Sequence, residues 1–114
     1  MRSKVKQIMF LDDERFPGRS FWEQDHQYAY IPKTYEGAKT LCSKEGCPNY
    51  ISFDHDLGLG LSGLDFAKWL IEQDLNTNGE FIPKDFTFVV HSQNPVGAKN
   101  IQELLTPYLS SKVL

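Results

Sequence analysis

The sequence lacks the features that mark several large classes of protein. It has only two cysteines, Cys42 and Cys47, with no second pair and no helpful histidine spacing. Neither a zinc site nor a redox pair is therefore predicted, and reduced structural thiols are favoured. No apolar run reaches the roughly 18 residues of a membrane span, and no secretory signal pattern is present. We expect a cytoplasmic protein without a membrane partner.

The charge balance argues against an extended nucleic-acid-binding surface. The 114 residues include 12 basic and 15 acidic ones, a formal net charge of −3, whereas non-specific binding to a nucleic-acid backbone needs a basic surface. An enzyme that binds one phosphate in a local pocket is still allowed. A hydrophobic content of 40% is ordinary for a globular chain, and no repeat or linker interrupts it, so we expect residues 1–114 to form one domain. The oligomeric state is left open.

Short apolar runs alternate with helical patterns along the chain. Strands are expected at 7–11, 26–31, 50–53 and 86–90, and helices from Thr34 to about Lys44, from Ser62, and from Asn94. Residues 19–25 show no helical stripe, and Pro107 is expected to kink or end the last helix. This order predicts an α/β fold, a doubly wound and mainly parallel sheet of about four strands.

Three of the expected strands end in polar residues. The first is followed by Asp12 and Asp13, the third by Asp54, His55 and Asp56, and the fourth by His91, Ser92 and Asn94. The carboxyl ends of parallel strands lie along one edge of a sheet, where such folds bind ligands, so we expect one shared site. The alternative is a set of solvated turns, and a turn-capping role is expected for at least one of Asp13 and Asp56.

The residue types at these ends favour phosphate chemistry with a divalent cation. Asp12, Asp13 and Asp54 are candidate ligands for Mg²⁺ or Mn²⁺, because crowded carboxylates repel unless a cation neutralises them. Asp54, His55 and His91 are the candidate catalytic residues, with the histidines as base and acid in phosphodiester cleavage. Which histidine has which role is open. The phosphate would be bound by the hydrogen-bond donors of Arg15, Ser92 and Asn94. For Arg15, a surface ion pair with a nearby acid is an alternative role.

The arrangement resembles a response-regulator receiver domain, whose fold is flavodoxin-like. In receivers an acidic pair ends the first strand and another Asp ends the third, as Asp12-Asp13 and Asp54 do here. Two features depart from that family. The first helix is replaced by Phe16-Pro17-Gly18 and the residues after it, and the fifth strand with its characteristic lysine is missing, since Lys112 is a poor substitute. Phosphorylation of Asp54 in signalling is therefore an alternative only.

Three motifs resemble more closely the cyclic-phosphate-processing receiver domains, a family derived from receivers. They are Leu11–Arg15, Phe53–Gly58 and His91–Gly97. The resemblance implies an enzyme-like site, in RNA repair or nucleotide conflict systems, that processes cyclic phosphates. We therefore expect a metal-assisted phosphoesterase whose partner is a small nucleotide or an RNA end bearing a cyclic phosphate. A nucleotide-binding module without catalysis is the other alternative.

Overall fold

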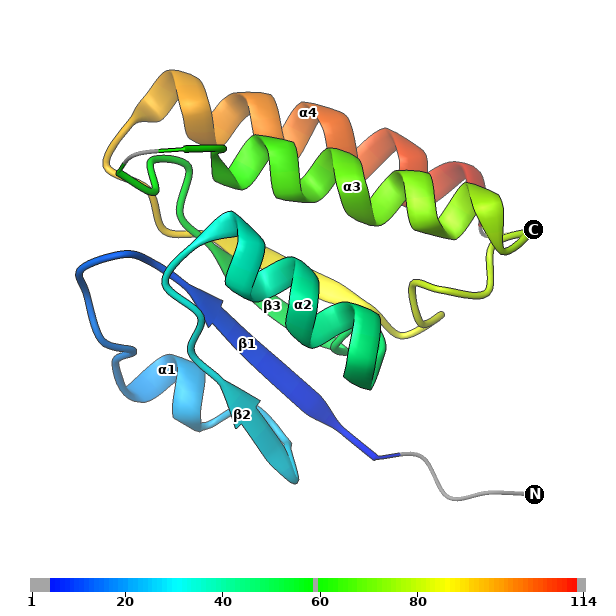
Figure 1. Cartoon of the computed structure of the whole chain (residues 1–114), viewed down its shortest axis with the longest axis horizontal. Coiled ribbons are helices and arrows are strands. Elements are labelled where there is room, and N and C mark those ends of the chain that lie inside the picture. Colours follow the sequence, from blue (N-terminus) through cyan, green and yellow to red (C-terminus); the bar gives the residue numbers. More distant parts are fainter. Residues whose placement is uncertain (1–4, 59, 113–114) are drawn as a thin grey trace.

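The computed structural model describes residues 5–58 and 60–112, which form a parallel sheet with helices on both faces (Figure 1). The strands are β1 (Gln7–Leu11), β2 (Tyr28–Tyr30), β3 (Tyr50–Phe53) and β4 (Thr87–Val90). The helices are α1 (Arg19–Trp22), α2 (Tyr35–Glu45), α3 (Gly63–Asn76) and α4 (Pro95–Lys112). Within these ranges, no helix combines the length and apolar character needed to cross a membrane.

The sheet has the strand order β2-β1-β3-β4, and every neighbouring pair is parallel. This confirms the predicted α/β fold. In the described part of the chain β4 is an edge strand, in agreement with the missing fifth strand of a receiver. The last register pairs are Leu11 with Phe53 and Phe53 with Val90. The next residue of each of these three strands therefore lies beside the next residue of its neighbour.

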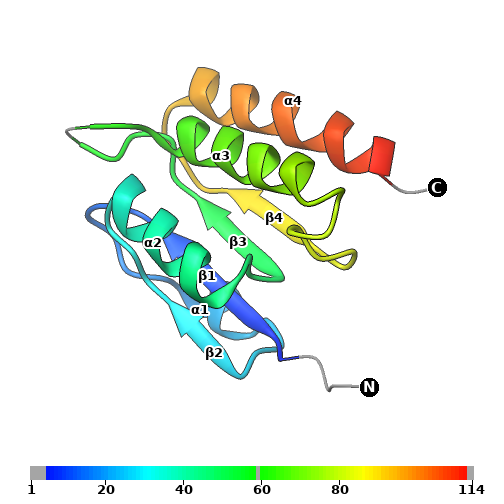
Figure 2. The same ribbon diagram turned by 45° about the vertical axis from the view of Figure 1, so that its right-hand side comes forward.

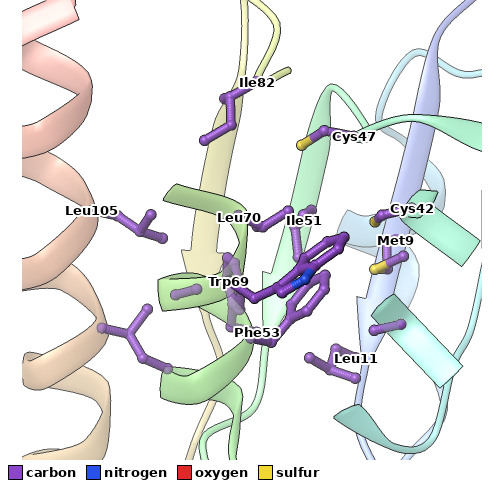
Figure 3. Packing of buried hydrophobic residues seen from close by; sticks show 14 of the residues in the cluster. Met9, Leu11, Cys42, Cys47, Ile51, Phe53, Trp69, Leu70, Ile82 and Leu105 are labelled. Atoms are coloured by element: carbon purple, nitrogen blue, oxygen red, sulfur yellow. The ribbon is translucent and has the colours of Figure 1, made fainter. Parts of the chain in front are cut away.

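The two faces of the sheet are covered unequally. The helices α2, α3 and α4 cover the face that holds the main core, and α3 and α4 lie side by side in both views (Figure 2). The residues of this core include Met9, Leu11, Ile51, Phe53, Trp69, Leu70, Ile82 and Leu105 (Figure 3). The other face has a small cluster, Ile8, Phe10 and Phe21, under the four-residue helix α1. Strand residues alternate between these two clusters.

The cysteines belong to the main core. Cys42 and Cys47 are both buried and free. Burial raises the pKa of the Cys42 thiol to about 12, and it also raises the pKa of Cys47. Both side chains are therefore neutral thiols at physiological pH, which agrees with the structural role expected from their spacing.

The structure corrects the sequence interpretation of residues 19–25, which indicated no helix. Arg19–Trp22 forms one helical turn, and Phe21 on it is buried while Trp22 is 45% exposed. A single turn places one side chain on the sheet, so it leaves no repeating apolar stripe in the sequence.

Pro107 was expected to kink or end the last helix, and it does not end it, because α4 continues through Pro107 to Lys112. The side chain of Pro107 is exposed. The turn after Pro107 is fixed to α3, since the Tyr108 hydroxyl and the Lys112 ammonium group each bind the buried carboxylate of Asp74 at 2.7 Å. These tertiary contacts compensate for the hydrogen bond that proline cannot donate.

The start of α3 is fixed by a capping box and by a close backbone contact. The Ser62 hydroxyl accepts from the Asp65 N–H, and the Asp65 carboxylate accepts from the Ser62 N–H, the arrangement that the spacing Ser-x-x-Asp favours at a helix start. The next residue, Gly63, is buried, and its N–H donates to the His55 carbonyl at 2.8 Å. A Cβ atom at Gly63 would lie 1.8 Å from the Asp54 carbonyl oxygen. Only glycine allows α3 to begin this close to β3.

We expect Gly63→Ala to lower the free energy of unfolding by at least about 2 kcal/mol, because the added methyl group meets backbone that cannot move aside cheaply. Urea unfolding followed by circular dichroism measures this change. Gly18→Ala is the matched control: a Cβ there has no neighbour within 4 Å, so its effect should stay within about 0.5 kcal/mol. Equal stability of the two variants would contradict the close contact.

Candidate functional site

Asp12, Asp54 and His91 meet at the carboxyl edge of the sheet. Each is the first residue beyond its strand, and the ladder continues to them: the Asp54 N–H donates to the Leu11 carbonyl at 3.0 Å, and the His91 N–H to the Phe53 carbonyl at 2.9 Å. One possible ligand atom from each of the three side chains lies within 4.8 Å of the others. The structure thus brings together one polar residue from each of the three strand ends.

These three side chains lie on the sparsely covered face of the sheet, the face that carries α1. Phe10 and Ser52 stand two residues before Asp12 and Asp54, so strand alternation places them on the same face. The rings of Phe10 and His91 stack with their centroids 4.4 Å apart and their planes 4° from parallel. The Phe10 ring therefore supports the His91 imidazole from the side of the sheet.

The His91 ring is held at both nitrogens. Its Nε2 lies 2.9 Å from Asp12 Oδ2, and its Nδ1 lies 2.7 Å from Ser52 Oγ. A carboxylate only accepts hydrogen bonds, so in the neutral ring Nε2 carries the hydrogen and the Ser52 hydroxyl donates to Nδ1. Sequence reasoning missed Ser52. The feature that could have indicated it is a hydroxyl side chain between Ile51 and Phe53, inside an otherwise apolar strand.

Asp12 is a buried carboxylate with several donors around it. Its Oδ1 accepts the N–H groups of Glu14 and Arg15, each at 2.8 Å, and the Arg15 Nε lies 3.9 Å from Oδ2. Burial by itself raises the pKa of Asp12, but the N–H groups of Arg15 and Glu14 and the hydrogen bond from His91 outweigh it, so the pKa is lowered. Asp12 is therefore ionised at neutral pH.

Asp54 lies beside Asp12, but its pKa is shifted in the opposite direction. It is 7% exposed, and burial, followed by the negative charge of Asp12, raises its pKa. The interactions with His91, the His55 N–H group and Arg15 lower the pKa, but they offset the rise only in part. Two adjacent carboxylates with opposite shifts form a site that a positive charge would stabilise.

His55 belongs to a second cluster, on the other side of the edge. It follows Asp54 by one residue, and its ring lies against the first turn of α4, where a Cβ at Gly97 would be 2.4 Å from the His55 Cγ. Its Nδ1 is 3.0 Å from Asp56 Oδ1, and the Asn94 amide donates to Asp56 Oδ2 at 3.5 Å. The structure thus separates the two histidines into different hydrogen-bonding groups.

The remaining candidate residues shape the loops around the site. Asp13 is half-buried, and its Oδ2 lies 3.0 Å from the position that a Cβ would take at Gly58. Ser92 Oγ accepts the Asn94 N–H at 3.0 Å, and Asn94 Oδ1 accepts the Gly97 N–H at 3.0 Å, which caps α4. The expected roles of Asp13 toward a cation, and of Ser92 and Asn94 toward a phosphate, stay predictions.

A comparison with protein families adds to this geometry. The profile described as "Cyclic-phosphate processing Receiver domain" matches residues 7–107. The chain belongs to this family. The match spans all four strands and most of α4, and it includes every candidate site residue. A comparison with curated proteins found none that matches the chain.

A solved structure with a similar fold is a fusion protein that contains the yeast Spc42 trimeric coiled coil. It aligns with a TM-score of 0.58 and 24% sequence identity, over 90% of this chain and 66% of that one. This chain therefore matches only about two thirds of the length of that protein. At this identity the likeness shows the fold alone.

The opposite pKa shifts of the two carboxylates give a prediction for stability. Asp54→Asn should raise the free energy of unfolding of the cation-free protein at neutral pH, because the wild-type carboxylate is ionised there against burial and the charge of Asp12. Since the pKa of Asp54 is higher in the folded state, its ionisation lowers stability as the pH rises from its unfolded value to its folded value. The gain from the substitution should therefore disappear as the pH falls through that window.

Urea unfolding of both proteins from about pH 3 to pH 7 tests this. Asp12→Asn is the contrast: the pKa of Asp12 is lowered, so its ionised form stabilises the fold above its unfolded pKa, and this stability is lost as the pH falls through the folded value. The free energy of unfolding of Asp12→Asn should be lower by about 1.5–3 kcal/mol at neutral pH, because the hydrogen bonds to the charged carboxylate are lost. A destabilised Asp54→Asn variant would contradict the crowded acidic site.

Proposed function

We propose that this protein is a phosphoesterase that opens cyclic phosphates, such as the 2′,3′-cyclic end of an RNA or a cyclic nucleotide. The observation that carries the proposal is the cluster of Asp12, Asp54 and His91, with ligand atoms within 4.8 Å of one another and the Arg15 guanidinium beside it. The family description, which links the chain to the processing of cyclic phosphates, supports it. Water would add to phosphorus, one ring P–O bond would break, and a phosphate monoester and a free ribose hydroxyl would result.

The cluster suits a divalent cation, Mg²⁺ or Mn²⁺. Asp12 and Asp54 offer hard carboxylate oxygens, and the raised pKa of Asp54 reflects a repulsion that a cation would relieve. His91 has a possible ligand atom in the same group, and if it bound the cation the donor set would favour Mn²⁺. Because its other ring nitrogen is held by a hydrogen bond, this role is an alternative to proton transfer by His91. Asp13 is proposed as a further ligand. When bound, the cation would stabilise negative charge that develops on the phosphate oxygens.

His55 is the proposed general base. Asp56 accepts from Nδ1, which leaves the lone pair of the neutral ring on Nε2, and no described residue hydrogen-bonds to that nitrogen. Asn94 holds Asp56 in turn. This base takes a proton from the attacking water, and His91 is proposed to protonate the departing ribose oxygen. Arg15, with its planar donors, would stabilise the charge on the phosphate oxygens.

Histidine substitutions test these roles. His55→Ala and His91→Ala should each lower the turnover of a 2′,3′-cyclic nucleotide by about 10²–10⁴-fold, and the double variant should be little worse than the poorer single one. The bell-shaped pH profile should lose its acidic limb in His55→Ala and its basic limb in His91→Ala. The matched control is His26→Ala, because this third histidine hydrogen-bonds to the Gln24 carbonyl, lies near the Trp22 ring and has no contact with the candidate site among the described residues, so it should be dispensable.

Two results would count against the assignment. Full turnover by a folded His55→Ala variant would remove this histidine from the mechanism. No product from cyclic nucleotides, cyclic-phosphate RNA ends or cyclic dinucleotides, with Mg²⁺ or Mn²⁺ present, would refute the proposed activity itself.

Cation binding gives a second test that does not depend on turnover. Titration with Mn²⁺, followed by electron paramagnetic resonance, should show weaker binding in Asp54→Asn and unchanged binding in His55→Ala. Weaker binding in His91→Ala would assign His91 to the cation instead of to proton transfer. If His91 is a ligand, Ser52→Ala should also weaken binding by about 10- to 100-fold, because the Ser52 hydroxyl orients the His91 ring. Normal Mn²⁺ affinity with slow turnover in His91→Ala would restrict this residue to proton transfer.

A further inference from the structure

The loop after β1 exposes an aromatic ring on the residue that follows Arg15 in the sequence. Phe16 is 77% exposed, more than any other large apolar side chain in the described part of the chain. It directly follows Arg15, whose guanidinium lies beside Asp12. A side chain of this size usually packs into the core. Here Phe21, and not Phe16, belongs to the small buried cluster under α1. The fold therefore does not account for the exposed ring.

A cation from a second loop lies over this ring. The Lys33 Nζ is 4.5 Å from the centroid of Phe16. Lys33 follows Pro32, whose carbonyl accepts the Asp12 N–H at 3.4 Å, so the loop after β2 is anchored to the same edge of the sheet (Figure 1). Cation–π attraction holds the ring without burying it. A chain with a net charge of −3 thus places Arg15 and Lys33 together next to its candidate phosphate site.

An exposed ring and a cation beside a phosphate-binding group are the elements with which proteins bind single-stranded nucleic acids, where bases stack on aromatic side chains. We propose that Phe16 and Lys33 form a nucleobase subsite, on which the base stacks while the phosphate lies at Arg15. This inference rests on the proposed function and narrows its substrate class. The substrate is a nucleotide cyclic phosphate, free or at the end of an RNA, and not the cyclic phosphate of a simple polyol.

The test compares two substrates that share the reacting group. One is adenosine 2′,3′-cyclic phosphate, and the other is 1-O-methylribose 2,3-cyclic phosphate, which lacks the base. Phe16→Ala should raise the KM for the nucleotide by about 5- to 150-fold, the range of one lost stacking contact, with a much smaller rise for the analogue without a base. Phe16→Trp should restore the low KM. The control is Leu75→Ala, an equally simple truncation of a 63% exposed side chain at the far end of α3, which should change neither KM.

Equal KM values of the wild-type protein for the two substrates, or an equal rise in Phe16→Ala for both, would overturn the subsite. A short single-stranded RNA ending in a cyclic phosphate separates the two sources of substrate. A lower KM for this RNA than for the mononucleotide assigns the subsite to RNA ends, and the reverse order assigns it to free nucleotides; either order supports base recognition.

A binding measurement separates failure of this subsite from failure of the proposed activity. If the wild-type protein opens neither cyclic phosphate, calorimetric titration with adenosine 3′-monophosphate decides on the subsite alone. Binding that is weakened in Phe16→Ala and restored in Phe16→Trp supports it. Absent binding, or affinity that Phe16→Ala leaves unchanged, overturns it.

Discussion

The parallel register of β1, β3 and β4 is the constraint on which the candidate site depends. Leu11 pairs with Phe53 and Phe53 with Val90, so the residues directly after them are neighbours across three strands. Because side chains alternate along a strand, all three of these residues point to the face opposite the main core. A shift of one strand by a single residue would exchange its polar end group for a core residue. The apolar core therefore fixes the positions of the polar groups.

The electrostatics of the site result from this forced proximity. The strand register places the carboxylates of Asp12 and Asp54 side by side in a buried position. The surrounding groups stabilise the ionised form of Asp12 but not that of Asp54. Asp12 receives two N–H groups and a histidine, whereas burial and the charge of its neighbour raise the pKa of Asp54. This asymmetry leaves the free protein with an unbalanced negative charge at neutral pH. This asymmetry supports the proposal of a cation at the cluster, while Oδ1 of Asp12 also caps the turn after β1.

Sequence reasoning could reach the fold because its signals are local. Apolar runs and caps, such as the pair Ser62 and Asp65, depend on neighbours in the chain, and they located the strands and the starts of α2, α3 and α4, but not the single turn α1. The sequence predicted that the polar strand ends lie at one edge of the sheet, but not which of their side chains lie on the same face. That face depends on the residue at which each strand ends and its side chains stop alternating between the two faces. The separation of His55 from His91 and the contribution of Ser52 depend on these faces. The last turn of α4 depends on Asp74, which is distant in sequence.

The far end of the fold contributes to the position of the site. The buried Asp74 carboxylate accepts from the Ile82 N–H and binds Tyr108 and Lys112, each at 2.7 Å, which fixes the C-terminal end of α4 to α3 and to the loop before β4. A helix is stiff along its axis, so fixing one end restricts the other. At that other end Gly97 meets the His55 ring at a distance that leaves no room for a side chain. The packing of α4, to which this salt bridge contributes beside the buried Ile101 and Leu105, therefore sets the space that is available to the His55 ring.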